Sequence, residues 1–392
     1  MNLAESNVSI VSVVGPNVGK CGYCQGKDTS HTFGVWAYYL TCEDYQQLID
    51  KGWRRSGEYV YKPNLRTSCC PQYAIKLDAS KFKPSKSQKK LVHKFNRFVQ
   101  GDWTPNSEED VNTGNKKPQQ KSEPAGMDTL PTLLSRAEHT SNDETERPKK
   151  YELEIEMEPS SFTAEKYSLY RKYQIGIHHD PPSKLKEKSF RQFLVDSPLK
   201  RYSFNRDDGA PCSGYGSYHQ TYRLDGKLIA MAVLDILPNC VSSVYFMYDP
   251  EYAFLSLGKY SALREIALTQ EFEEKVSKEL HWYYMGYYIH SCTKMRYKGQ
   301  YKPSYLLDSE AATWEPIEKC VPLLDKTGFV PFHKALMGEA TDMDSTSANG
   351  VDSISNSANC LRSVLAIFSG MLAPITVSFV AFQFSPTLDF WN

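Results

Sequence analysis

Four cysteines near the start of the chain have the types and spacing of metal ligands. Cys21 and Cys24 form a C-x-x-C pair, and Cys69 and Cys70 stand side by side further along. Together they offer four thiolates, the full ligand set of a tetrahedral zinc ion or of an iron–sulfur cluster. Adjacent side chains diverge, which strains chelation of one small ion but is tolerated by a cluster with separate iron corners. We predict one metal centre on these residues, an iron–sulfur cluster or alternatively zinc; unconnected thiols in an aromatic core are the remaining interpretation.

Two basic stretches have the composition of nucleic-acid contacts. Residues 81–97 carry seven cations and no acid, with apolar residues at helical spacing beneath them, which predicts an amphipathic basic helix that binds phosphate. A solvated helix face is the alternative. Residues 294–302 interleave aromatic rings with cations, a pattern that suits a single-stranded nucleic-acid end whose bases stack and whose phosphates pair. The predicted nucleic-acid-binding residues are Lys86, Lys89, Lys90 and Lys94 in the first stretch and Arg296, Tyr297, Lys298, Tyr301 and Lys302 in the second.

Composition excludes several classes of protein. Of the 392 residues, 41% are apolar and 23% are charged, which excludes wholesale disorder and collagen. Lys+Arg and Asp+Glu both total 46, so any attraction for nucleic acid must be local. The first twenty residues lack the basic start and long apolar stretch of a signal peptide, which predicts a reducing compartment, the cytoplasm and also the nucleus. No G-x-S-x-G elbow supports a serine hydrolase.

The elements that must position these residues fall into two folded blocks. Residues 1–103, rich in Cys, Tyr and Trp, predict a small N-terminal domain that ends with the basic helix. Residues 104–150 contain no aromatic residue and predict a disordered linker. Its apolar residues are interpreted as isolated rather than as a short contact helix: Leu130, Leu133 and Leu134. Residues 151–338 predict a second domain, and 339–392 a divergent tail, first polar and then apolar.

The second block predicts an α+β fold. Asp225-Gly226 is a strong two-residue hairpin signal between apolar runs. The predicted elements are strands at 217–224, 227–236 and 241–248, a helix at 256–278 and a strand at 281–290. This order matches the central part of the N-acetyltransferase-like (GNAT) fold, in which the third and fourth of these strands splay apart. Its turn at 249–258 has one glycine and two carboxylates instead of a glycine-rich phosphate loop, so we expect no coenzyme A and another activated acyl donor.

The tail contains an uncharged stretch at 364–384 that is long enough to span a bilayer. Gly370, Pro374 and Gln383 interrupt it, and Arg362 is the one cation beside it. We therefore expect no membrane span, although this tail leaves a membrane contact open.

Several long strings resemble the eukaryotic arginyl-tRNA–protein transferase family. In the first block they are CGYC (21–24), SCCPQYAIKLD (68–78) and SKSQKKLVHKFNRFVQGDW (85–103). In the second block they are SFRQFLVDSPL (189–199), AVLDILPNCVSSVYFMYDPE (232–251), LSLGKYSALREI (255–266) and YYMGYYIHSCTKMRYKGQYKPSYLLD (283–308).

The resemblance implies an enzyme, an arginyltransferase, that moves arginine from arginyl-tRNA onto the N-terminal amine of a protein. Its implied substrates begin with Asp, Glu or oxidised Cys, and arginylation commits them to the ubiquitin-dependent N-degron pathway. It also implies a GNAT-like catalytic domain without coenzyme A and an iron–sulfur cluster or zinc on the N-terminal cysteines. After Met337 the sequence departs from the family pattern. The alternative function is therefore a catalytically impaired isoform that acts as a tRNA-binding or regulatory protein.

The implied reaction needs an amine held against an ester carbonyl, a proton acceptor and support for the oxyanion. Asp235 and Asp249 each end a predicted strand, and we predict them as the catalytic carboxylates, with Glu251 pairing with the arginine guanidinium. Turn chemistry at strand ends is the alternative for each. Four further residues are predicted to contact tRNA or substrate: Tyr173, His178, Lys259 and Arg264.

Overall fold

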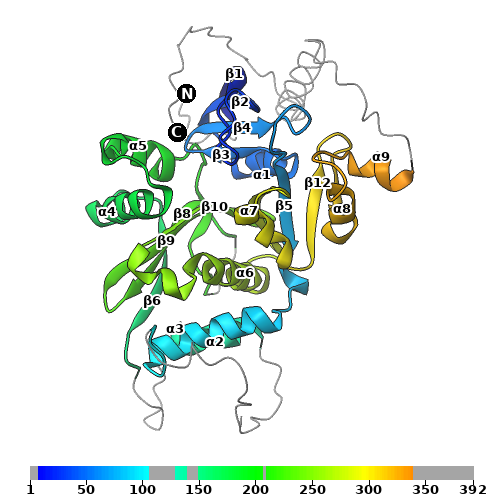
Figure 1. Cartoon of the computed structure of the whole chain (residues 1–392). Coiled ribbons are helices and arrows are strands. Elements are labelled where there is room, and N and C mark those ends of the chain that lie inside the picture. The colour runs from blue at the N-terminus through cyan, green and yellow to red at the C-terminus, as the bar shows by residue number, and fades with distance from the viewer. Residues whose placement is uncertain (1–7, 106–128, 139–148, 206–208, 339–392) are drawn as a thin grey trace.

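The computed structural model describes residues 8–105, 129–138, 149–205 and 209–338, and two β-sheets form its frame (Figure 1). The strands of the smaller sheet are β1 (Ile10–Gly19), β2 (Ser30–Tyr39), β3 (Arg54–Ser56) and β4 (Tyr59–Pro63). They pair antiparallel in the order β1–β2–β4–β3. Helix α1 (Cys42–Asp50) connects β2 to β3, and its apolar side chains join the buried cluster around Trp53.

The larger sheet takes strands from both blocks of the sequence. In spatial order they are β13 (Thr313–Pro316), β12 (Ser304–Asp308), β5 (Tyr73–Asp78), β11 (Trp282–Tyr288), β10 (Cys240–Tyr248), β9 (Lys227–Leu237), β8 (Gly214–Leu224) and β6 (Leu153–Pro159), with β7 (Tyr202–Ser203) paired to β8. Strand β5 comes from the first block, yet it lies between β12 and β11. The predicted boundary at residue 103 therefore does not separate the two sheets.

The central strands agree closely with those predicted from the sequence. Strands β8, β9 and β10 form the predicted antiparallel run, and Asp225 and Gly226 adopt φ values of 50° and 76° in the hairpin turn between β8 and β9. Strands β10 and β11 pair in parallel, but only from Cys240–Ser242 against Trp282–Tyr284. Both strands continue beyond this ladder without pairing to each other. We call the point where the ladder ends, after Ser242 and Tyr284, the β10–β11 fork.

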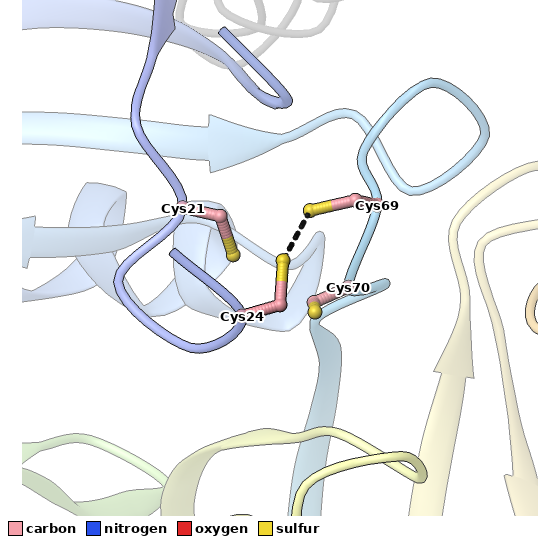
Figure 2. Close-up of side chains that lie close together, drawn as sticks. All are labelled: Cys21, Cys24, Cys69 and Cys70. Carbon is pink, nitrogen blue, oxygen red and sulfur yellow. Dashed lines mark hydrogen bonds between the residues drawn. The ribbon is translucent and has the colours of Figure 1, made fainter. Parts of the chain in front are cut away.

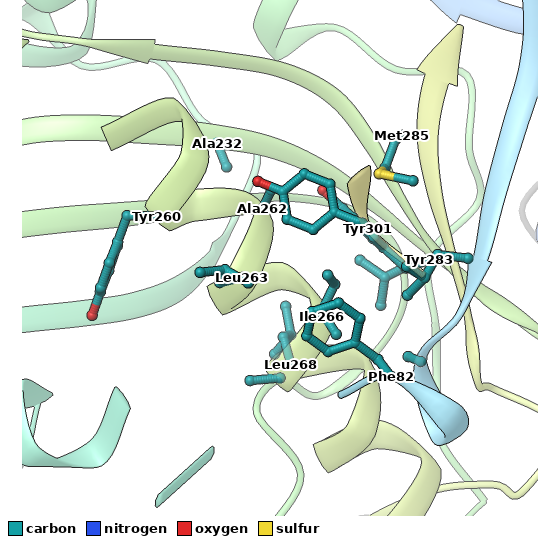
Figure 3. Close-up of a cluster of buried hydrophobic side chains, with 14 of the residues drawn as sticks. Phe82, Ala232, Tyr260, Ala262, Leu263, Ile266, Leu268, Tyr283, Met285 and Tyr301 are labelled. Carbon is teal, nitrogen blue, oxygen red and sulfur yellow. The ribbon is translucent and has the colours of Figure 1, made fainter. Parts of the chain in front are cut away.

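Helix α6 (Leu257–Lys275) confirms the predicted long helix, and the short 3₁₀ segment η7 (Pro250–Leu255) precedes it. The apolar face of α6 packs against β10 and β11 in the main core. Figure 3 shows Leu263 and Ile266 of this helix among Tyr283 and Met285 of β11 and the rings of Phe82 and Tyr301. The helix thus fixes the strands on both sides of the fork.

Helix α2 (Lys86–Gln100) is the predicted amphipathic basic helix. Ser85 and Gln88 form a capping box at its start, and Gly101 ends it with a φ of 83°. The ring of Phe95 stacks on Tyr260 of α6 with centroids 3.9 Å apart, so the apolar face is buried. The basic face is thereby directed away from the core.

One helix corrects the predicted linker. Helix α3 (Leu130–Glu138) buries Leu130, Leu133 and Leu134 against α2 and α6, and Asn96 of α2 donates to the carbonyl of Leu133 at 2.8 Å. Those leucines are core residues and not isolated apolar side chains. The composition of the flanking residues hid the helix, because its stabilising contacts are all with distant segments.

The remaining helices are short. They are α4 (Ala164–Tyr173), which continues into a π-turn, η4 (Gln174–His178), then η5 (Pro182–Lys184), α5 (Glu187–Phe190), the π-turn η6 (Arg191–Val195), α7 (Thr293–Arg296), η8 (Tyr297–Gln300), α8 (Ile317–Leu324) and α9 (Phe332–Met337). They pack on different parts of the larger sheet: α4 contacts β9 and β10, α7 contacts β11, and α8 contacts β12 and β13. A 3₁₀ turn, η2 (Ala79–Lys81), follows β5. None of the described helices is both long and apolar enough to cross a bilayer. The apolar stretch at 364–384 lies outside the described residues.

Candidate functional site

The four predicted metal ligands come together. Cys21 and Cys24 lie in the loop after β1, and Cys69 and Cys70 lie in the loop after β4 (Figure 2). The four sulfur atoms lie within 4.8 Å of one another, and those of Cys24 and Cys69 are 3.2 Å apart. The predicted grouping of these thiols is confirmed, and a set of four thiolates on two loops suits a metal ion.

The protein environment affects the thiols unequally. A hydrogen bond from the backbone of Gly26, with help from Cys69, lowers the pKa of Cys24 to about 7. Burial raises the pKa of Cys70 and that of Cys69. Metal binding requires thiolates, so an ion would have to displace the protons of the two raised thiols.

We expect a Cys69→Ser, Cys70→Ser double variant to lose most of its bound metal, because two of the four ligands are removed. Zinc, iron and sulfide would be quantified per chain after anaerobic purification. Cys212→Ser is the matched control, since Cys212 is half-buried and lies outside the cluster. Full metal content in the double variant would rule out a shared centre.

Aromatic side chains gather beside the β10–β11 fork. The ring of Tyr173, at the end of α4, lies 5.2 Å from His178, 6.3 Å from Tyr245 and 5.1 Å from Tyr248, between centroids. Tyr245 Oη donates to the side chain of Gln174 at 3.0 Å. The predicted pair of Tyr173 and His178 is thus brought together, and β10 adds two tyrosines that sequence reasoning did not single out.

Lys298 and Glu265 face the interior near the same fork. Lys298 Nζ donates to the carbonyl of Tyr287 at 2.9 Å, and burial lowers the pKa of Lys298 to about 7. Glu265 of α6 is 1% exposed and accepts a hydrogen bond from Tyr283 Oη at 2.7 Å. Burial raises the pKa of Glu265 to about 7 despite that bond and one from Ser243. Both groups can exchange protons near neutral pH.

The rest of the second basic stretch is divided between surface and core. Arg296 is 52% exposed, 3.6 Å from Asp325, and Lys302 forms an exposed ion pair with Glu318 at 3.0 Å. Tyr297 is half-buried. Tyr301 is buried, with its ring centroid 6.4 Å from that of Phe82, so its faces are not presented to solvent.

The three predicted catalytic acids do not share one site. Asp235 is fully buried, accepts two hydrogen bonds of 2.7 Å from Arg55, and lies opposite Ser242 near one end of the β9–β10 hairpin. Asp249 follows the other end of β10, because antiparallel strands end at opposite edges of a sheet. The expectation that both strand ends meet one cleft is therefore corrected.

Asp249 and Glu251 do lie together, beside Lys227. Lys227 Nζ is 3.5 Å from Asp249 and 2.9 Å from Glu251, whose side chain is 70% exposed. Burial is the largest influence on Asp249 and works against its ionisation. The hydrogen bonds from Lys172, at 2.8 Å, and from the backbone of Glu251, together with the charges of Lys172 and Lys227, outweigh it and lower the pKa of Asp249. Its carboxylate also accepts from the backbone N–H of Glu251, so it caps η7.

The remaining predicted cations occupy different settings. Lys86 and Lys90 on α2 are exposed, and Lys89 is half-buried. Lys94 lies 4.1 Å above the ring of Trp103, a cation–π contact. Lys259 is exposed at the start of α6. Arg264 forms ion pairs with Glu138 at 3.0 Å and Glu271 at 2.9 Å, so a contact between Arg264 and tRNA would require these pairs to open.

Comparison with known proteins gives consistent matches across both blocks. A family model described as "Arginine-tRNA-protein transferase, N terminus" matches residues 19–90, and one described as "Arginine-tRNA-protein transferase, C terminus" matches residues 165–308. Arginyl-tRNA–protein transferase 1 of Drosophila melanogaster is 37% identical over 79% of this chain and 83% of its own length. The Arabidopsis thaliana protein of the same name is 31% identical over 82% and 75%.

Two more distant matches extend the comparison. An aspartate/glutamate leucyltransferase of Pseudomonas syringae is 26% identical over 74% of this chain and 91% of its own length. The solved structure of L-PGS from Bacillus licheniformis covers 64% of this chain and 52% of its own, with 14% identity and a TM-score of 0.25, which is too low to assign a fold.

Proposed function

The chain belongs to the arginyl-tRNA–protein transferase family and is a transferase, and we propose that it moves arginine from arginyl-tRNA to the N-terminal amine of proteins that begin with Asp, Glu or oxidised Cys. We propose that this arginylation feeds the ubiquitin-dependent N-degron pathway and takes place in the cytoplasm and nucleus. The observation that carries the proposal is the gathering, at the β10–β11 fork, of aromatic rings, an inward-facing ammonium and a buried carboxylate.

We also propose a GNAT-like catalytic domain that binds no coenzyme A. Two observations support this fold. The parallel ladder between β10 and β11 stops before the C-terminal end of either strand, and the long helix α6, which lies between these strands in the sequence, packs on both of them. Ser256, with a φ of 53°, begins α6 without a side-chain cap, which leaves backbone N–H groups for an oxyanion.

The reaction proposed is aminolysis of an ester. The amine nitrogen attacks the carbonyl carbon that joins arginine to the tRNA ribose, a C–N bond forms, and the C–O bond to the ribose oxygen breaks. The proton lost by the amine ends on that oxygen. Because an α-amine has a pKa of about 7.7–8.0, a positioned carboxylate is a sufficient relay. Asp249 and Glu251 remain the proposed carboxylates, and Glu251 is the more accessible of the two.

For tRNA, the proposed contacts are the lysines of α2 with Lys259, Arg296 and Lys302. These cations lie wholly or partly at the surface, where a phosphate backbone can reach them. Tyr173, His178 and Tyr297 are proposed to hold the 3′ end, whose bases can stack on rings.

For the metal centre, we propose a single tetrahedral ion, with zinc as the candidate. A zinc–sulfur distance of about 2.3 Å places tetrahedral sulfur atoms about 3.8 Å apart. The observed limit of 4.8 Å is close to that value, whereas a four-iron cluster binds each thiolate at a different iron and needs a wider spacing. A four-thiolate ion has no open position, so its contribution would be to hold the two loops together.

The proposal is tested by incubating the full chain with radiolabelled arginyl-tRNA and a peptide that begins with Asp. We expect label to appear on the peptide, and none on the same peptide with an acetylated N-terminus, because the amine is the nucleophile. Binding of arginyl-tRNA without any transfer would instead favour the tRNA-binding or regulatory alternative.

A further inference from the structure

Two positively charged side chains converge on an irregular point of β11. Gly286 has a φ of 68°, and the register of β11 against β5 shifts between Tyr284 and Tyr287. Arg54 Nη2 donates to the carbonyl of Gly286 at 3.4 Å, and Lys298 Nζ donates to the next carbonyl, that of Tyr287, at 2.9 Å. The bulge thereby holds one cation from β3 and one from η8.

Neither cation has an anionic partner in the described part of the chain. Arg54 is 6% exposed and donates to three carbonyls, those of Ile49, Trp53 and Gly286. Its Nε is buried without a hydrogen-bond partner, and no carboxylate among the described residues lies within 4.0 Å of Arg54 or Lys298. The adjacent residue shows the contrast, because Arg55 forms a bidentate pair with Asp235.

A buried cation and a half-buried one that lie near each other without a carboxylate are costly. The rings of Tyr284 and Tyr287, with centroids 5.2 and 5.4 Å from the Arg54 guanidinium carbon, offset part of this cost for Arg54. For Lys298, burial and then the charge of Arg54 lower its pKa, whereas Cys292 and Glu265 act in the opposite direction. An arrangement of this kind becomes favourable when an anion binds.

We propose that Lys298, with Arg54 behind it, binds the acidic side chain of the first residue of the protein substrate. This inference rests on the proposed function, since it names where that function distinguishes an acidic N-terminal residue. Lys298 is half-buried and makes the direct contact, while Arg54 supplies a second positive charge from within the protein. A carboxylate, or the acid group of an oxidised cysteine, is small enough to reach an ammonium that is held inward against β11.

The alternative anion is a tRNA phosphate, and the structure favours the carboxylate. The other cations of the same stretch, Lys294, Arg296 and Lys302, are turned to the surface, where a phosphate backbone would lie. The ammonium of Lys298 is instead held against the carbonyl of Tyr287 in β11, close enough to Glu265 for the two charges to interact. The relative from Pseudomonas syringae, which is 26% identical over 74% of this chain, is named an aspartate/glutamate leucyltransferase, and that name contains the same two acidic residues.

The test compares two fluorescent peptides that differ only in their first residue, which is Asp in one and Asn in the other. The two side chains have nearly the same shape, and only that of Asp is charged. Binding is measured at equilibrium without arginyl-tRNA, so the result does not depend on transfer. We expect the full chain to prefer the Asp peptide by at least about tenfold, and Lys298→Gln to bind both peptides alike. Lys298→Arg should keep part of the preference, which a purely structural role would not explain.

The control is Lys319→Gln, which removes an exposed lysine on α8 and should keep the full preference. Thermal unfolding of each variant shows whether it is folded. An unchanged Asp preference in folded Lys298→Gln would overturn the inference. If this variant also lost affinity for tRNA while it kept the peptide preference, Lys298 would instead bind a phosphate. Arginine transfer is assayed separately: failure of the full chain to transfer overturns the proposed function, whereas the peptide preference still decides the inference.

Discussion

Replacing Arg55 by methionine should lower the free energy of unfolding by about 3–5 kcal/mol, because it leaves the Asp235 carboxylate buried without its partner. Arg55 Nε and Nη2 each lie 2.7 Å from an oxygen of Asp235, and the two side chains are 2% and 0% exposed. Ser217 Oγ also donates to Asp235, at 2.7 Å, so this carboxylate is fully engaged. The pair joins β3 of the smaller sheet to β9 of the larger one.

The measurement is urea unfolding followed by tryptophan fluorescence. The double variant Arg55→Met, Asp235→Leu should be more stable than either Arg55→Met or Asp235→Asn, because an apolar pair leaves no buried charge. This comparison also tests the catalytic role that the sequence predicts for Asp235. If Asp235→Asn kept full stability but lost about 100-fold in turnover, Asp235 would act in the reaction and not in joining the sheets.

Local signals in the sequence predicted those elements whose stability is decided locally. The Asp225-Gly226 turn specifies its hairpin, and the periodic apolar face beneath the cations specifies α2, whose start the structure shows capped by Ser85. The two cysteine pairs were recognisable because metal ligands must meet whatever the fold between them. Each of these features can be identified from fewer than twenty consecutive residues or from residue type alone.

The features that sequence reasoning missed depend on contacts between distant segments. Strand β5 enters the large sheet beside strands that follow it by more than two hundred residues. Arg54 carries no local signal, since its significance comes from Lys298 reaching the same bulge. Asp235 and Asp249 each lie at the end of a predicted strand, but successive antiparallel strands end at opposite edges of the sheet, so this local pattern does not bring the two carboxylates together.

Between about pH 4.5 and 7, Glu265 should make the protein less stable as the pH rises. Burial raises its pKa from 4.5 to about 7 in the folded state, so in this interval the folded protein holds a proton that the unfolded chain has lost. Stability is therefore greatest below the unfolded value and falls as the pH rises toward the folded one. A difference of this size corresponds to about 3 kcal/mol lost across the interval.

Glu265→Gln should remove this dependence, because the amide oxygen can still accept the hydrogen bond from Tyr283 and cannot ionise. Urea unfolding of both proteins at half-unit steps of pH gives the difference between their free energies of unfolding, which isolates Glu265 from the carboxylates common to both.

Lys298 acts with the opposite sign and in another pH interval. Its folded pKa of about 7 lies below its ordinary 10.5, so its contribution to stability increases between these values. A difference curve that rises between pH 4.5 and 7, with Glu265→Gln gaining on the wild type, would place a proton-exchanging carboxylate next to the fork. A flat difference would mean that Glu265 is ionised at an ordinary pKa and is solvated when the protein is in solution.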